Sequence, residues 1–314
     1  MQKQSGIESI EEIFSLSGKG LFVFSDPGGA KPVLAIVDIF KDQLEYQILS
    51  DRVYKFYDDF GLIINKASRD PDDYISEFKP DFLFTGTSYS SSIELTFLKS
   101  AKKKGILTYS YVDHYTSIIE RFIHKGELVL PDTILLPDST AYEIAVKREI
   151  SETRLKVIGN PYLKFIQKWL PKIDRRTFFS SIQQEYTDKK IILYAPDPLS
   201  NVNGKEKFGF DEIAPTKSIN EVAFELREKC IFVFKPHPNQ SLDSLSPDFY
   251  SNMVLIDKMY DTNTLIYFSD TVIGFISNIL IEALELNKRV IRFIPSEIIN
   301  DPLIHYTQMV IINN

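Results

Sequence analysis

A chain of 314 residues with 44% hydrophobic and 25% charged side chains has the composition of an ordinary globular protein. Its net charge of −7 argues against a protein that binds nucleic acid through overall positive charge. No apolar run approaches the ~18 residues that a membrane-spanning helix needs, the N-terminus lacks the apolar core of a signal peptide, and the single cysteine, Cys230, cannot form an internal disulfide. We therefore expect a cytoplasmic protein.

The first half of the chain alternates short apolar runs with helical patterns. Strands are expected at 21–25, 45–50, 61–65, 80–88, 106–114, 133–138 and 154–161. Helices are expected over 7–16, 30–40, 71–78, 90–104 and 139–148. Strands this apolar, joined by helices through short connections, are typical of a parallel, doubly wound sheet.

Residues 161–188 are helical in pattern, rich in polar residues and without a strand, so we expect them to link two units. The alternation then resumes, with strands at 189–198, 231–235, 254–257, 271–275 and 289–293 and helices at 217–228, 262–268 and 277–285. The polar stretch 198–216 is expected to be a loop. The sequence therefore predicts an α/β fold of two Rossmann-like domains facing across a cleft, residues 1–162 and 163–314.

A basic and proline-rich motif follows one strand of the second half. The strand at 231–235 ends in Lys235, and His237 lies between two prolines, of which Pro238 is the second. The prolines restrict the loop, and the two basic side chains offer hydrogen bonds to an anion. We interpret the motif as part of a phosphate site, with an ordinary turn histidine as the alternative.

A helix start follows the strand at 271–275. Ser277 and Asn278 open this helix, whose first turn presents N–H groups and the positive end of the helix dipole. Both residues are also ordinary N-cap residues, and a cap exposed at a ligand site serves both purposes. Glu282, further along the helix, is a candidate for hydrogen bonds to ribose hydroxyls or an ordinary surface acid. Together with the basic motif, the helix start predicts binding of a nucleotide phosphate.

Candidate acid and base residues follow two strands of the first half. Asp26 comes directly after the first strand and is followed by Gly28 and Gly29, which allow the backbone to approach a ligand. Asp113 and His114 end another strand. A general base needs a carboxylate or an imidazole at such a place, and Asp26 and Asp113 are equal candidates. The alternative for each is a hydrogen bond within a cap or a loop.

The candidates for binding an acceptor substrate are Gly28 and Gly29, the hydroxyl groups of Thr87 and Ser88, and Arg121. Arg121 is equally compatible with an ordinary helical face. Asp70 and Asp72 match the Asp-x-Asp pattern of metal-dependent sugar transferases, but they precede a helical pattern, so we expect Asp70 to cap a helix. No residues stand at metal-ligand spacing, and no metal site is expected.

Two Rossmann-like halves, a glycine loop after the first strand, Lys-Pro-His-Pro and a Ser-Asn helix start resemble the GT-B glycosyltransferases. The similarity is to bacterial capsule and lipopolysaccharide enzymes of the sialyltransferase-like, Kdo-transferase-like and CDP-glycerol-transferase-like groups. The resemblance implies that His237, Pro238, Ser277 and Asn278 hold the donor phosphate and that Glu282 binds the ribose. It also implies a base at Asp26 or Asp113.

The resemblance further implies a metal-independent glycosyltransferase of bacterial surface polysaccharide synthesis. Its donor substrate would be a CMP-, CDP- or UDP-linked sugar, without a further cofactor. Its acceptor would be a glycan or a lipid-linked sugar, and nucleic acid is not an expected partner. Because lipid-linked acceptors lie at the membrane, a peripheral contact of the protein with the inner membrane is compatible with this interpretation.

Three alternatives remain beside this interpretation. They are a polyol-phosphate (CDP-glycerol-type) transferase, a nucleotide-sugar 2-epimerase and a non-catalytic binding module of a polysaccharide assembly complex. The stretch Tyr-Val-Asp-His-Tyr-Thr-Ser at 111–117 does not match the His-Val-Glu-Ala-Gly-like stretch of the epimerases. We therefore expect a transferase rather than an epimerase.

Overall fold

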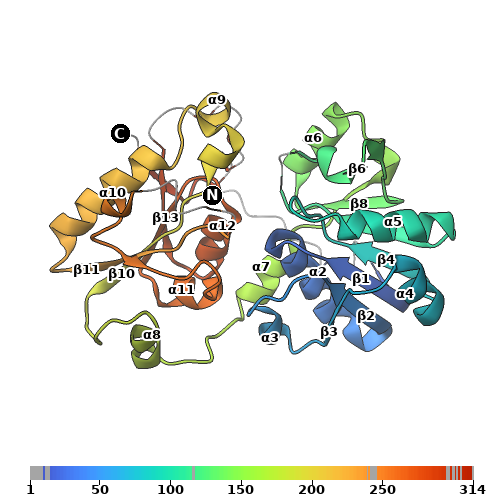
Figure 1. Ribbon diagram of the computed structural model, residues 1–314, viewed down its shortest axis with the longest axis horizontal. Coiled ribbons are helices and arrows are strands. Elements are labelled where there is room, and N and C mark those ends of the chain that lie inside the picture. The colour runs from blue at the N-terminus through green and yellow to red at the C-terminus, as the bar shows by residue number, and fades with distance from the viewer. Residues whose placement is uncertain are drawn as a thin grey trace, which may run out of the picture. The chain divides into compact units, whose positions relative to one another are not determined.

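The computed structural model describes Ile10 and residues 15–114, 117–238, 240, 246–294, 298, 301, 303–304 and 306–312. Most of the helix predicted over 7–16 lies outside these residues. The chain divides into two compact units, Met1–Phe165 and Ile166–Asn314 (Figure 1). The division falls in helix α7 (Pro161–Ile166), close to the predicted boundary after residue 162. Within the described ranges, no helix is both long and apolar enough to cross a membrane.

The first unit is built on a parallel sheet whose strands, in chain order, are β1 (Gly18–Phe24), β2 (Leu44–Ser50), β3 (Ile64–Lys66), β4 (Phe82–Thr85), β5 (Leu107–Tyr111), β8 (Thr133–Leu136) and β9 (Leu155–Val157). Its helices are α2 (Pro27–Phe40), α3 (Tyr57–Phe60), α4 (Pro71–Phe78), α5 (Ile93–Lys103) and α6 (Ser139–Lys147). Strands β6 (Ile123–His124) and β7 (Glu127–Leu128) form a small antiparallel hairpin. The order of the sheet is β3-β2-β1-β4-β5-β8-β9.

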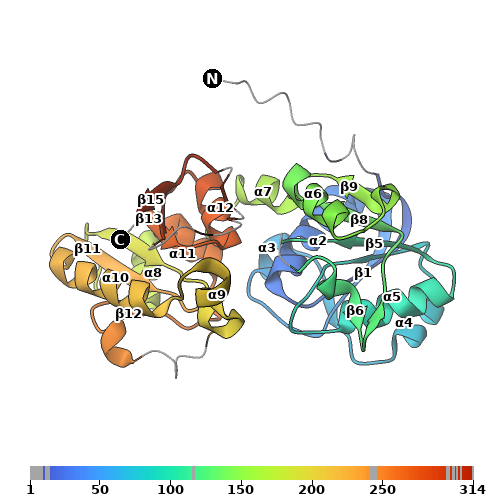
Figure 2. The same cartoon turned by 90° about the horizontal axis from the view of Figure 1, so that it is seen from above.

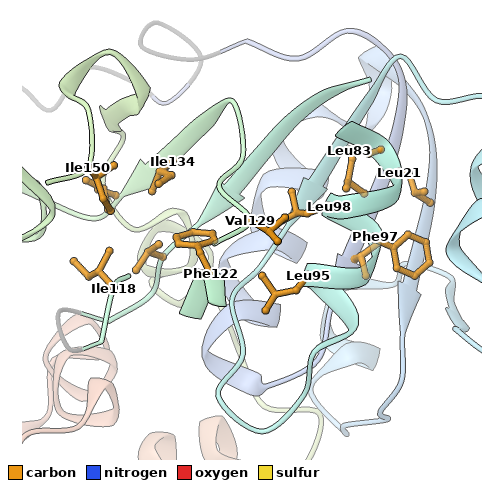
Figure 3. Packing of buried hydrophobic residues seen from close by; sticks show 14 of the residues in the cluster. Leu21, Leu83, Leu95, Phe97, Leu98, Ile118, Phe122, Val129, Ile134 and Ile150 are labelled. Atoms are coloured by element: carbon orange, nitrogen blue, oxygen red, sulfur yellow. The ribbon is translucent and has the colours of Figure 1, made fainter. Parts of the chain in front are cut away.

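Alternating apolar residues of the strands build the core of this unit. Leu21 of β1 and Leu83 of β4 are fully buried in one cluster with Phe97 and Leu98 of α5 (Figure 3). Burying a side chain of this size contributes about 1.5–3 kcal/mol, so the packing of α5 on the sheet is a major part of the stability. This packing holds the carboxyl ends of β1 and β4 side by side.

The second unit contains another parallel sheet, with strands β10 (Lys190–Tyr194), β11 (Cys230–Phe234), β12 (Val254–Leu255), β13 (Thr271–Gly274), β14 (Arg289–Phe293) and β15 (Val310–Ile312). Its helices are α8 (Arg175–Ser181), α9 (Gly204–Phe208), α10 (Ile213–Leu226), α11 (Thr262–Phe268) and α12 (Asn278–Glu285). The order of the sheet is β12-β11-β10-β13-β14-β15. Figure 2 shows α12 beside β13, and the helix packs on β13 and β14.

In each sheet, the order in which successive strands are added reverses once. The chain runs outward from the first strand of each unit and then returns to its other side, so the order reverses between β1 and β4 and again between β10 and β13. In open α/β sheets, ligands bind beyond the carboxyl ends of strands at such a point. These two reversal points are therefore the places to look for a site.

Most predicted elements are present, the prediction for 198–216 is wrong, and strands β6, β7 and β15 were not predicted. Helix α4 begins at Pro71 as predicted, and the Asp70 carboxylate accepts a hydrogen bond from the backbone N–H of Asp72 at 2.8 Å. The stretch 198–216 is not a simple loop, because it contains α9 and the first turn of α10. Strand β15 and the β6–β7 hairpin were not predicted, because such short and exposed strands carry almost no apolar pattern.

Candidate functional site

The first turn of α2, which follows β1, packs so closely against the loop after β4 that only glycine fits at positions 29 and 86. A Cβ atom on Gly29 would lie 2.7 Å from the carbonyl oxygen of Thr87, and one on Gly86 would lie 2.9 Å from the carbonyl carbon of Gly29. A Cβ atom on Gly28 would lie 1.9 Å from Oδ2 of Asp113. The space beside these predicted acceptor-binding glycines is therefore filled by Thr87 and Asp113 of the protein itself.

Asp26 holds the loop that follows β4. Its Oδ2 atom accepts hydrogen bonds from the backbone N–H groups of Tyr89 at 2.7 Å and Ser90 at 3.1 Å. Its Oδ1 atom accepts a hydrogen bond from the Ser90 hydroxyl and lies 3.3 Å from a guanidinium nitrogen of Arg52. Both carboxylate oxygens are thus bonded within the protein, which suits a residue that orders a loop better than a general base.

Asp113, Arg121 and Thr87 form a second network at the same edge of the sheet. Arg121 Nη1 donates to Asp113 Oδ1 at 2.9 Å and to Thr87 Oγ1 at 3.2 Å. The Arg121 and Asp113 side chains are only 10% and 11% exposed, so the ion pair is largely shielded from water. Arg121 lies in the 3-10 helical turn Glu120–Phe122, just before the β6–β7 hairpin, and its side chain contacts Asp113 instead of solvent.

His114 follows Asp113 directly and is half-buried. Burial lowers the pKa of its imidazole, because the charged form loses hydration; Asp113 opposes this shift and Arg121 adds to it. The imidazole is therefore neutral at pH 7 and able to accept a proton. His114 is therefore a candidate for the base beside the two carboxylates, both of which accept hydrogen bonds within the protein.

Glu94, in the first turn of α5, is a buried acid that the sequence analysis did not single out. It is 3% exposed, and its Oε1 atom accepts hydrogen bonds from the Ser25 backbone N–H at 3.0 Å and from the Ser88 hydroxyl. The Ser88 oxygen in turn accepts from the N–H of Asp26 at 2.9 Å. Burial raises the pKa of Glu94 to about 7. The only signal in the sequence is a Ser-x-x-Glu pattern at 91–94, which predicts an ordinary helix cap.

Replacing Glu94 with glutamine is expected to stabilise the protein above pH 7. In the folded state the carboxyl keeps its proton to about pH 7, whereas the pKa of a solvent-exposed glutamate is 4.5, so stability falls as pH rises between these values. The shift corresponds to roughly 3 kcal/mol, which the uncharged amide avoids. Urea unfolding at several pH values measures this slope. Glu77→Gln, at an exposed position of α4, is the control, and equal slopes for Glu94→Gln and wild type would contradict the prediction.

In the second unit, the loop after β11 holds the basic motif. The Lys235 side chain is 5% exposed, and its ammonium group donates to the carbonyl oxygen of Lys258 at 2.9 Å. The backbone N–H of Gln240 donates to the carbonyl oxygen of His237 at 2.9 Å, which closes a turn around Pro238. Lys235 therefore ties this loop to the chain after β12, while His237 is half-buried at the turn.

Helix α12 begins at Asn278 with Ser277 as its N-cap residue. The backbone of Ser277 is extended (φ −79°, ψ 150°), but its hydroxyl makes no hydrogen bond to the first turn. The Ser277 carbonyl oxygen accepts from the Leu280 N–H at 3.1 Å, while the hydroxyl caps none of the N–H groups of the first turn, where helices commonly bind anions. Glu282 is 6% exposed on the same helix, so the alternative of a surface acid is wrong.

Within the described part of the chain, no three His, Cys, Asp or Glu side chains come together in a group that would hold a metal ion. The structure brings the predicted residues together as two sets. One contains Asp26, Thr87, Ser88, Asp113 and Arg121 with the glycines, at the reversal point of the first sheet. The other residues follow β11 and β13 of the second sheet, and these two strands are separated by β10.

Comparison with known proteins finds likeness in structure and not in sequence. No protein-family model matches the chain, and no curated protein matches it. MnaA of Staphylococcus aureus, solved with UDP, is 14% identical with a TM-score of 0.68, over 94% of this chain and 84% of that one. A UDP-N-acetylglucosamine 2-epimerase from Listeria monocytogenes is 12% identical with a TM-score of 0.67, over 95% and 85%. The glycotransferase of kitacinnamycin is 12% identical with a TM-score of 0.52, over 95% and 87%.

The fold is of the GT-B type. Each unit has a parallel sheet with the strand order of a Rossmann-like domain, and the likeness to the solved structures extends over nearly the whole chain. The predicted fold class is confirmed. At this identity, the likeness establishes the fold alone, and the activity has to be argued from the site.

Proposed function

We propose that this protein is an enzyme that acts on a nucleotide-activated sugar, with a UDP-linked N-acetylhexosamine as substrate and epimerisation at carbon 2 as the reaction. The observation that carries the proposal is the likeness, over 94% and 95% of the chain, to a protein solved with UDP and to a UDP-N-acetylglucosamine 2-epimerase. This likeness favours the epimerase alternative over the transferase that the sequence motifs predict.

The second unit is proposed to bind the nucleotide. The uncapped first turn of α12 offers N–H groups and the positive end of its dipole to a diphosphate, next to the Ser277 hydroxyl. The His237 turn follows β11 of the same sheet and adds a hydrogen-bond donor. Glu282 is proposed to bind ribose hydroxyls. A helix dipole and an imidazole stabilise the negative charge of a leaving phosphate without a metal ion.

The first unit is proposed to supply the reacting groups. Epimerisation breaks the C2–H bond while the C1–O bond to the diphosphate breaks, which leaves a C1=C2 double bond. The diphosphate and a proton then add back, with the proton on the opposite face of C2, so the reaction needs a group that takes a proton and a group that returns one. His114 is neutral at pH 7 and suits the first task. Asp113 is proposed to orient the site through its ion pair with Arg121. Asp26 is proposed to do so by holding the loop after β4 in place.

Glycosyl transfer is the second candidate. It is favoured by the kitacinnamycin glycotransferase among the structural neighbours, and His114 could equally deprotonate an acceptor hydroxyl. In that case the first unit would bind the acceptor through Thr87, Ser88 and Arg121. The acceptor would then be a glycan or a lipid-linked sugar of a bacterial surface polysaccharide.

Incubation with UDP-N-acetylglucosamine in D2O, without an acceptor, separates the two reactions. Epimerisation exchanges the proton at C2 with solvent, so the recovered nucleotide sugar should carry deuterium at C2, which NMR and mass spectrometry detect. Glycosyl transfer leaves C2 unlabelled and forms a product only when an acceptor is added. An unlabelled nucleotide sugar would contradict the epimerase proposal, and the absence of any product with a panel of glycan acceptors would contradict the transferase as well.

A further inference from the structure

One peptide group, directly before the N-cap of α12, is held from both sides by charged side chains. The N–H of Ile276 donates to Oδ2 of Asp197 at 3.0 Å. The carbonyl oxygen of Phe275, in the same peptide group, accepts from Nε of Arg292 at 2.9 Å. Because both polar atoms of this group are bonded, its plane cannot rotate without breaking a hydrogen bond to a charged group.

The two side chains come from the two strands that flank β13. Asp197 follows β10, and Arg292 is part of β14. The end of β13 is packed tightly against the chain after β10, since a Cβ atom on Gly274 would lie 2.9 Å from the carbonyl oxygen of Ala195. The sheet therefore brings one anion and one cation to the turn that leads from β13 into Ser277.

Burial and the neighbouring charged groups set the pKa of Asp197. Burial raises the pKa of Asp197 to about 6, while the Ile276 N–H and Arg292 on β14 lower it and Glu212, just before α10, raises it. Arg292 is itself bound by Asp301 through both terminal nitrogens, at 2.8 and 2.6 Å. Asp197 is thus a charged acceptor at neutral pH and loses its charge in mildly acidic solution.

We propose that Asp197 is a positioning residue for nucleotide binding, which fixes the Phe275–Ile276 peptide group and so the direction in which the chain enters Ser277 and the groups that meet the diphosphate. This inference rests on the proposed function of the second unit. It assigns a role in substrate binding to an acid that does not itself bind the phosphate. It also predicts that affinity for a nucleoside diphosphate falls as the pH drops below about 6, where Asp197 becomes protonated.

The test is the Kd for UDP of the full-length protein, measured by calorimetry between pH 5 and 8. Asp197→Ala should weaken binding about tenfold or more at pH 7.5, because the Ile276 N–H loses its charged acceptor. Asp197→Asn keeps an acceptor oxygen, so it should bind more tightly than the alanine variant. Because the terminal phosphate of UDP also gains a proton near pH 6, the asparagine variant should show a smaller decline of affinity below pH 6 than wild type.

Asp270→Ala is the matched control. Asp270 accepts a hydrogen bond from the backbone N–H of Ile191 at 2.8 Å, at the opposite edge of the same sheet. Its loss should lower stability without changing the Kd. If Asp197→Ala lowers stability as the control does and binds UDP as tightly as wild type, Asp197 is only structural and the inference is overturned.

A second measurement keeps the inference separate from the proposed function. In wild-type protein, the backbone amide NMR signals of Ser277 and Asn278 should titrate with a midpoint near pH 6, and in Asp197→Asn they should not. If wild type binds no UDP, the proposed function fails. The pH titration of the Ser277 and Asn278 amide signals then decides by itself whether Asp197 fixes the turn between β13 and α12. Identical titration in wild type and Asp197→Asn would overturn that role.

Discussion

Replacing His114 with asparagine is expected to lower the kcat of the proposed reaction about 10²- to 10⁴-fold, which is the usual contribution of a positioned general base. Asparagine is similar in size and can keep a hydrogen bond, but it cannot take a proton. The fold should persist, because His114 is only half-buried and lies outside the regular elements, three residues after β5. Turnover of UDP-N-acetylglucosamine, followed by NMR, measures the effect.

The pH dependence of kcat gives an independent readout of the same residue. The pKa of His114 is lowered by burial, so wild-type turnover should stay constant near neutral pH and fall as the pH drops through this lowered pKa. His124→Asn, in strand β6, is the matched control and should leave kcat unchanged. A His114→Asn variant that turns over within threefold of wild type would remove His114 from the mechanism.

Replacing Arg292 with methionine is expected to have the largest effect on stability. The Arg292 side chain is 1% exposed and forms a two-pronged ion pair with Asp301, which is 13% exposed. Removing one partner of a buried pair leaves an uncompensated charge and costs about 3–5 kcal/mol. Folded proteins have a total stability of about 5–15 kcal/mol, so the variant should be marginal. Urea unfolding measures the loss.

Two further variants show whether the buried charge is the cause. Arg289→Met, at the exposed first position of the same strand, should change stability by less than about 0.5 kcal/mol. Combining Arg292→Met with Asp301→Asn removes the unpaired charge and should recover part of the loss. If the double variant is no more stable than Arg292→Met alone, the loss arises from packing and not from charge.

The fold could be predicted because strands buried on both faces are continuous apolar runs, and the helices between them begin at recognisable residues. Thr262–Phe268 and Arg289–Phe293 have the predicted bounds. The exposed strand β15 escaped prediction because three residues with no buried face do not form a pattern.

The candidate site could be predicted only in part. The sequence places polar residues after strands, but it does not show what those residues bind. Asp26 has the position expected of a base, yet its carboxylate is bonded to the loop at Tyr89 and Ser90, more than 60 residues away in the chain. The pairing of Glu94 with Ser25 and of Asp197 with Ile276 likewise depends on contacts across 69 and 79 residues. Such contacts exist only once the strands are ordered in the sheet.

Binding of a nucleotide to the wild-type protein tests the central claim most directly. A thermal-shift series should compare CMP, CDP, UDP and GDP and their sugar conjugates. We predict that UDP and UDP-N-acetylglucosamine raise the unfolding midpoint, because a ligand at 100 times its Kd stabilises the folded state by about 2.7 kcal/mol. His237→Ala should reduce this shift. If no nucleotide or nucleotide sugar in the series raises the midpoint of the wild-type protein, the proposal of a nucleotide-sugar enzyme is contradicted.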